Sequence, residues 1–221
     1  MCCSWIVISQ TLLFSAGMTP KKRPTKQDLV PILQVFNSFH PIGKGVERFL
    51  LKHCYCIDLT KEKYLLRNGE KCDSVYFVKK GLLRGFVKEN NKEITTWFAL
   101  ENEMVAALTT FVMQLPAQEN IQAIEDCELV ALTIADLDRL YIKYPSFNVI
   151  GRKVMELYYV LAENRAYICR LHDADKKYEL FLQYFSHFAN RVKLTYIASF
   201  LGITIETLSR VRAKVSSRKK K

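Results

Sequence analysis

The sequence predicts an α+β protein in which an N-terminal antiparallel β-roll, flanked by helices, precedes a long helix and a C-terminal helix-turn-helix domain. Three observations predict this order. Short β-forming runs alternate with turn residues between Tyr55 and Leu132, helical spacing returns from Ala135, and residues 194–213 have the spacing of two crossed helices. With 221 residues and 49% hydrophobic content, the chain can bury one core or a larger and a smaller one.

We interpret residues 1–26 as a leader. The run Cys2 to Gly17 is apolar, but no positive residue precedes its centre, and it is too short and too broken by polar residues to span a bilayer. Met18 begins a basic, polar stretch. We therefore expect residues 1–17 to reflect either a start codon assigned too early or a disordered tail.

The next segments change from helical to strand periodicity. Residues 28–39 and 44–53 have apolar spacings near 3.6 and predict two short helices. Turn residues then separate runs of about strand length. The predicted strands are Ser74–Val78, Leu82–Lys88, Glu93–Phe98, Asn120–Ile124 and Glu128–Ile134, with a short helix or helical turn at Ala106–Gln114.

Helical periodicity then persists to the C-terminal region. Ala135–Lys143 predicts a helix that the Tyr144-Pro145 step ends, and a longer helix follows. Apolar residues recur along it at alternating spacings of three and four, with one polar Asn164. These are Phe147, Ile150, Val154, Leu157, Leu161, Asn164, Ile168 and Leu171. Such a stripe can pack on the β-domain, but sustained heptad spacing favours a paired helix and predicts a homodimer.

The segment Leu194 to Ala213 has the pattern of a helix-turn-helix. Small Ala198 allows two helices to cross closely, and Gly202 permits the left-handed turn between them. The apolar residues fall where the two helices face each other. They are Ile197, Leu201, Ile203, Leu208 and Val211. A further helix at Ala174–Ala189 carries aromatic residues on one face and belongs to the same small core.

The outer face of the second helix carries groups suited to DNA. Thr204 is placed to cap this helix, and Glu206 lies in its first turn. Arg210 can pair with guanine and Glu206 can accept from cytosine, although the two can instead form a solvated ion pair. The full set of predicted DNA-binding residues is Thr195, Thr204, Glu206, Thr207, Ser209, Arg210, Arg212 and Lys214.

Positive charge is concentrated near the C-terminus. The chain has 33 Lys and Arg against 22 Asp and Glu, a formal charge of +11. Residues 190–221 contain nine basic residues and one acidic residue, and so contribute +8 of that charge. A local basic surface favours an anionic partner such as double-stranded DNA. The final Arg218–Lys221 adds unspecific phosphate attraction or is disordered.

From about Gln27 to Val215 the chain resembles the Crp/Fnr family of transcription regulators. The resemblance is carried by Ile197–Arg212, and it is supported by Val75–Arg84 and Ile121–Leu129. It implies a cyclic-nucleotide-binding-like sensor, a dimerisation helix, a winged-helix DNA-binding domain and RNA polymerase as a further partner. The implied domains are residues 27–144, 145–171 and 172–221. In the family, a further basic residue that contacts bases comes directly before the acidic one, which is Glu206 here. This chain has Ile205 at that position, which changes the expected base preference.

The sensor departs from the nucleotide-binding pattern that this resemblance implies. Relatives that bind a cyclic nucleotide hold it with a Gly-Glu-Leu run and a following arginine, whereas this chain has Ala106–Leu108 and Ala117–Glu119 there. No arginine occurs between Arg84 and Arg139. Because the phosphodiester then lacks a bidentate cation and would meet Glu119, we expect no tight cyclic nucleotide binding. The effector, if there is one, is not specified by the sequence.

Cysteine and histidine placement gives no cofactor or metal site. The seven cysteines show no CxxC pair, so we expect reduced thiols in a cytoplasmic protein and no iron–sulfur cluster. Cys169, His172 and Asp175 could form a metal corner, but a solvated helix end explains them more simply. We therefore expect neither a cofactor nor a metal ion.

Two other protein classes fit the sequence less well than a regulator. A small-molecule-binding or cupin-like β-barrel without a DNA role would need paired histidines on its strands, and no His-x-His occurs. A membrane-surface module would need a basic amphipathic helix with exposed aromatic residues, which the last thirty residues lack. The prediction is thus a non-enzymatic, DNA-binding homodimer with no membrane partner.

Overall fold

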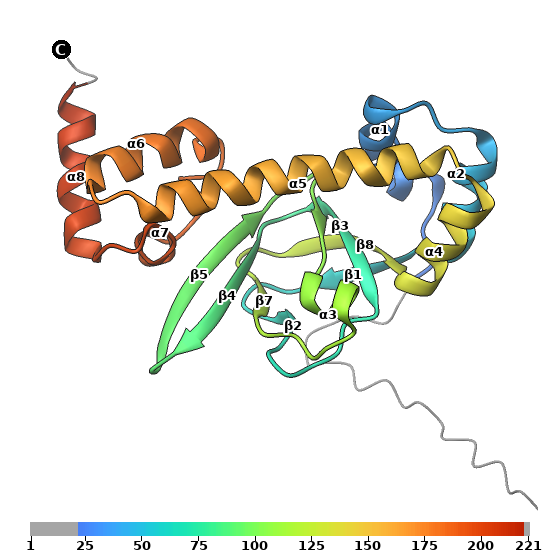
Figure 1. The fold of residues 1–221 in the computed structure, drawn as a ribbon, viewed down its shortest axis with the longest axis horizontal. Helices are drawn as coiled ribbons and strands as arrows, with labels where there is room; N and C mark the ends of the chain where they lie inside the picture. Colours follow the sequence, from blue (N-terminus) through green and yellow to red (C-terminus); the bar gives the residue numbers. More distant parts are fainter. Residues whose placement is uncertain (1–21, 219–221) are drawn as a thin grey trace, which may run out of the picture.

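The computed structural model describes residues 22–218, in which two four-stranded antiparallel sheets and eight helices form the fold. A long helix, α5 (Phe147–Arg170), crosses the molecule above the β-domain (Figure 1). One end of α5 meets the N-terminal helices, and the other meets the C-terminal helices. Residues 1–21 of the predicted leader, residues 1–26, lie outside the described residues. The rest of that segment is ordered, because Lys22 forms a β-bridge with Cys56 and Thr25 caps the first helix.

Two helices precede the sheets, as the spacing predicts. They are α1 (Lys26–Phe39) and α2 (Lys44–His53). Thr25 and Asp28 form a reciprocal capping box at the start of α1, because Asp28 N donates to Thr25 Oγ1 and Thr25 N donates to Asp28 Oδ2 at 2.8 Å. This cap fixes where the first helix begins.

The β-roll contains the five predicted strands, each within two residues of its predicted bounds, together with three short strands that the spacing did not predict. In chain order they are β1 (Tyr55–Leu59), β2 (Tyr64–Leu66), β3 (Ser74–Lys80), β4 (Leu83–Glu89), β5 (Lys92–Ala99), β6 (Met104–Val105), β7 (Asn120–Ala123) and β8 (Cys127–Thr133). The sheet orders are β1-β8-β3-β6 and β2-β7-β4-β5. A short helix, α3 (Leu108–Met113), confirms the predicted helical turn.

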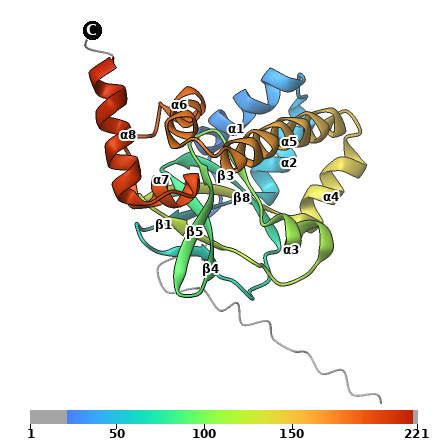
Figure 2. The same ribbon diagram turned by 60° about the vertical axis from the view of Figure 1, so that its left-hand side comes forward.

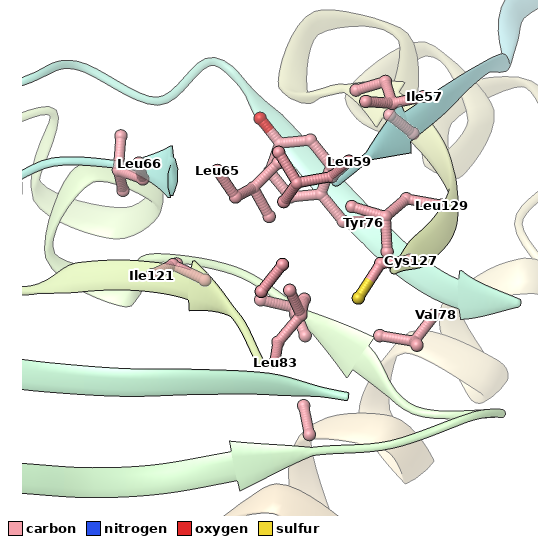
Figure 3. Packing of buried hydrophobic residues seen from close by; sticks show 14 of the residues in the cluster. Ile57, Leu59, Leu65, Leu66, Tyr76, Val78, Leu83, Ile121, Cys127 and Leu129 are labelled. Carbon is pink, nitrogen blue, oxygen red and sulfur yellow. The ribbon is translucent and has the colours of Figure 1, made fainter. Parts of the chain in front are cut away.

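Apolar side chains from both sheets fill the space between them (Figure 3). Leu59 and Leu129 enter from the first sheet, and Leu83 and Ile121 enter from the second; all four are almost fully buried. Close packing of this kind is the main favourable contribution to folding. The interior of the β-roll is therefore a packed core.

Two helices leave the β-roll toward the C-terminal region. The first, α4 (Ile134–Lys143), is capped by Thr133 and ends before Pro145, as predicted. The second is α5, which begins inside the N-terminal core with buried Phe147 and Ile150.

Within residues 22–218, no helix combines the length and apolar character needed to cross a membrane.

The C-terminal region contains α6 (Ala174–Phe185), α7 (Leu194–Leu201) and α8 (Ile205–Arg218). Their core is rich in aromatic side chains, and the ring of Phe181 packs against those of both Phe188 and Phe200. The helix predicted to reach Ala189 ends at Phe185 and continues as turns. Residues 172–218 contain no strand, so the wing implied by the resemblance is not part of this described segment.

Candidate nucleic-acid interface

The turn between α7 and α8 has the geometry that the sequence predicts. Gly202 adopts φ +63° and ψ +39°, the left-handed region in which a side chain is disfavoured. The Ile203 amide then donates to the Ala198 carbonyl at 3.0 Å and closes the end of α7. The two helices are held in a fixed relation by this turn.

The start of α8 is capped by Thr204, whose Oγ1 accepts a hydrogen bond from the Thr207 amide at 3.2 Å. Glu206 lies in the first turn, where its own backbone amide and the Thr204 hydroxyl lower the pKa of its carboxyl group. A fully exposed carboxylate thus stands at the positive end of the helix. It keeps its charge at neutral pH.

The two faces of α8 divide as the pattern predicts. Leu208 and Val211 are buried against α6 and α7, whereas Glu206, Ser209 and Arg210 are exposed. Glu206 and Arg210 do not form an ion pair with each other in the structure. Of the other predicted DNA-binding residues, Thr195, Thr204 and Lys214 are exposed, and Thr207 and Arg212 are half-buried. Base contact by these residues stays a prediction.

Three of the nine basic residues in residues 190–221 have acidic partners within the chain. Lys214 pairs with Asp175 on α6, and Lys193 lies 3.4 Å from a carboxylate oxygen of Glu62. Arg191 donates to both Glu101 and Glu125 with distances of 2.6–3.0 Å. The free positive surface is consequently smaller than the residue count suggests.

An unexpected contact joins α7 to the edge of the β-roll, and we call it the β5–α7 contact (Figure 2). The Ser199 hydroxyl accepts from the Thr95 amide at 2.9 Å and donates to the Glu93 carbonyl at 2.8 Å. Strand β5 is the last strand of its sheet, so this hydroxyl satisfies part of an otherwise open edge. The first helix of the helix-turn-helix is therefore fixed to the edge of the β-roll.

Arg84 strengthens the β5–α7 contact from within. Its side chain is 1% exposed, and its guanidinium lies 3.7 Å from the ring centre of Tyr196 on α7 and 4.1 Å from that of Phe86. One nitrogen donates to Glu93 at 2.7 Å and to Gln122 at 2.9 Å. Sequence reasoning missed this role, although an arginine inside the apolar run Leu82–Phe86 is the signal that could have shown it.

Comparison with known proteins agrees with this architecture. Residues 57–144 match the cyclic nucleotide-binding domain family. The chain is 27% identical over 165 residues to the transcriptional activator protein Anr of Pseudomonas protegens, covering 69% of this chain and 67% of that protein. A structure of CooA from Carboxydothermus hydrogenoformans matches 89% of this chain and 87% of its own, with 19% identity and a TM-score of 0.66. The structure of FixK2 from Bradyrhizobium japonicum matches 75% of this chain and 86% of its own, with 16% identity and a TM-score of 0.64.

The chain is thus similar to transcription regulators of the Crp/Fnr type, with a cyclic nucleotide-binding domain match at residues 57–144. The resemblance stated from Ile197–Arg212 is thereby confirmed, and so is the predicted class of fold. The shared β-roll and C-terminal helices place this regulator's sensor and helix-turn-helix in the order that the sequence predicts.

Two of the positions that the resemblance assigns to cyclic nucleotide binding carry small, buried side chains. Ala107 and Ala117 belong to the β-roll core and are almost fully buried. Glu119 is engaged with Trp97, whose Nε1 donates to its carboxylate at 2.7 Å. No basic side chain comes from either segment.

The predicted dimer seam on α5 meets the chain's own core at both ends. Phe147 and Ile150 are buried among the N-terminal helices, and Ile168 is buried among the C-terminal helices. Val154, Leu161 and Asn164 are half-buried, and Leu157 is exposed. The three buried residues are therefore unavailable to a partner. The spacing identified the face that packs on the chain's own domains.

The described cysteines and histidines do not gather into a metal site. Within residues 22–218, no cluster of three or more His, Cys, Asp or Glu side chains has metal-binding geometry. Cys54, Cys72 and Cys127 are buried, and burial raises the pKa of the Cys54 and Cys127 thiols to about 12. Such thiols are protonated and unreactive at neutral pH.

Proposed function

We propose that this regulator binds specific double-stranded DNA as a homodimer, with α8 of each subunit in the major groove. The observation that carries the proposal is the division of α8 into a buried face and an outer face with unpaired Glu206 and Arg210. Such a helix can place an acid and a guanidinium against base edges. Cytoplasmic location, RNA polymerase as a partner and the absence of catalysis complete the proposal.

The dimer interface that we propose lies on a different face of α5 from the predicted seam. Met155, Tyr159, Ala162, Ala166 and Cys169 follow one another at alternating spacings of four and three, and all five are exposed and uncharged. This is the spacing of a coiled-coil seam, and the two alanines allow close helix approach. Its position leaves the packed face of α5 undisturbed.

The other exposed flank of α5 is less suited to a dimer. Leu157, Val160 and Tyr167 lie there, but Lys153 and Glu156 interrupt the flank and form an ion pair at 3.0 Å. Charged pairs of this kind are typical of a solvated surface. We therefore assign the partner helix to the Met155 face.

Selection of bound fragments from a random duplex pool tests the proposal. We expect a palindromic consensus whose half-sites are centred roughly 34 Å apart, one helical turn, because two symmetric α8 helices would enter successive major grooves. A pool that shows no enrichment over random sequence contradicts specific binding. Enrichment of a single, non-repeated half-site contradicts the dimer.

We also propose that cyclic nucleotides are not the effector. The segments Ala106–Leu108 and Ala117–Glu119 supply no cation for a phosphodiester, and Glu119 is engaged with Trp97. Calorimetry with cyclic AMP and cyclic GMP should give no micromolar binding. Saturable binding in that range by either nucleotide would contradict this part of the proposal.

A further inference from the structure

A large apolar cavity lies between α5 and the β-roll. Its volume is about 850 Å³, and its lining includes Phe36 of α1, Leu108 of α3 and Leu161 of α5. A space of this size accommodates a small organic molecule. It lies along the outside of the packed β-roll core, beside the helix that leads to the DNA-binding region.

Four charged side chains line this cavity: Glu103, Glu119, Arg152 and Arg165. Arg152 pairs with Glu156, whereas the charge of Arg165 acts on both Glu103 and Glu119. Burial raises the pKa of each carboxyl group, and the Arg165 charge opposes that shift in both. Two carboxyl groups thus share one guanidinium. A second positive charge at this place would be stabilised, and a negative charge would be repelled.

Tyr158, one of the two tyrosines that line the cavity, already uses its hydroxyl in hydrogen bonds to the backbone. The Tyr158 hydroxyl accepts from the Met104 amide at 2.7 Å and donates to the Met104 carbonyl. It has no further proton to donate to an anionic ligand. Near Trp97, the groups left to contact a ligand are the carboxyl oxygens, the Arg165 guanidinium and the aromatic surfaces.

Trp97 is held in place by a specific feature of strand β4. A Cβ atom at Gly85 would lie 2.1 Å from Trp97 Cε2, so only glycine allows the indole to lie against the strand. In this position Trp97 lines the cavity while its Nε1 donates to Glu119. An indole beside a carboxylate is a favourable environment for an organic cation, because the ring face attracts positive charge.

We propose that this cavity binds a small apolar molecule carrying one positive charge, with its cationic group beside Trp97, Glu103 and Glu119. The inference deepens the proposed function, on which it rests for its regulatory meaning, by giving the chemical class of the effector. The ligand cation competes with Arg165 for the two carboxyl groups. Because Arg165 lies one turn before buried Ile168, this competition acts where α5 joins the C-terminal core.

Calorimetry on the full-length protein tests the inference, with benzyltrimethylammonium, phenylacetate and cyclic AMP as probes. We expect saturable binding of the cation only. Glu119→Gln should weaken it about tenfold, since removal of one buried counter-charge costs on the order of 1.4 kcal/mol or more. Glu89→Gln is the matched control, because Glu89 is exposed at the far end of β4. The affinity of Glu89→Gln for benzyltrimethylammonium should equal that of the unaltered protein.

Three outcomes overturn the inference: tighter binding of phenylacetate than of the cation, an unchanged affinity in Glu119→Gln, or no heat from the cation at millimolar concentration. Circular dichroism of Glu119→Gln verifies that the variant is folded, and Glu103→Gln provides a second variant if it is not. DNA binding is measured separately. Failure to bind DNA would refute the proposed function without deciding what the cavity binds.

Discussion

The guanidinium of Arg84 lies 3.7 Å from the ring centre of Tyr196, so a fully buried residue of the sensor is stacked on the first helix of the helix-turn-helix. Two of its nitrogens, Nε and Nη1, have no hydrogen-bond partner in the described structure. Burying such a cation is costly unless aromatic and acidic neighbours offset the lost hydration. The contacts of Arg84 with Tyr196, Phe86 and Glu93 therefore have to offset the cost of burying its charge.

Arg84→Ala should destabilise the fold by roughly 3 kcal/mol, because it removes the aromatic stacking and leaves a cavity between the two regions. Arg84→Met retains much of the apolar contact and removes the unpaired nitrogens, so its loss should be clearly smaller. Urea unfolding followed by circular dichroism measures both variants. Equal losses in the two would show that the charge, and not the packing, supports the contact.

Arg191 should make stability depend on pH through Glu101. The Arg191 guanidinium lowers the pKa of the Glu101 carboxyl group from its usual 4.5 to about 2. The folded-state pKa is depressed, so this stabilisation is complete above about pH 4.5 and is lost as the pH falls toward 2. Unfolding of wild type and Glu101→Gln between pH 7 and pH 3 measures it. The difference between the two proteins should shrink on acidification, and a constant difference would contradict the pairing.

Arg210→Ala should weaken cognate DNA binding by about 1–3 kcal/mol and relax one base position. Lys214→Ala should weaken all sequences alike, since a phosphate contact carries no base information. Fluorescence anisotropy on cognate and random duplexes distinguishes the two. If Arg210→Ala lowers both affinities equally, Arg210 does not read a base.

The pairing of Lys214 with Asp175 adds a prediction that the sequence alone does not give. Asp175→Asn releases the ammonium group from its partner and removes a negative charge near α8. We expect stronger binding to every duplex and a steeper salt dependence, because one more cation is free for phosphate. Titrations at several salt concentrations measure this slope, and an unchanged slope would show that Lys214 does not approach DNA.

Gly202→Ala should destabilise the C-terminal region by about 1–2 kcal/mol, since a side chain is disfavoured at φ +63°. Nothing lies closer than 3.7 Å to the added methyl, so the loss is conformational rather than steric. Gly43→Ala is the matched control: Gly43 has φ −83° and open space around it. Thermal unfolding of the two variants should differ accordingly, and a stable Gly202→Ala would contradict the role of the turn.

Met155→Glu should dissociate the proposed dimer, because it places a charge in the Met155 face of α5. Val160→Glu is the control, since Val160 has nearly the same exposure, 51% against 49%, on the other flank. Sedimentation velocity gives the oligomeric state of each. Dissociation by Val160→Glu alone would assign the interface to the opposite flank.

The sequence predicted those features that depend on local chemistry. Gly202 and Thr204 mark the turn and the cap because backbone conformation and helix ends have strong residue preferences. The seam on α5 shows the limit of this reasoning. Periodicity identifies an apolar face but not what covers it, and Phe147 and Ile168 pack on the chain's own domains. Arg84 was missed because its partners Phe86 and Tyr196 come from separate domains.

Ser199 has a consequence for how a signal reaches DNA. Because its hydroxyl is bonded to the backbone of β5, any displacement of that strand would move α7 directly, and α8 would follow through the Gly202 turn. In the proposed regulator, a signal in the β-roll would thus have a short path to the operator that bypasses the long helix. Ser199→Ala would cut this path while leaving α5 unchanged, which separates the two routes of communication.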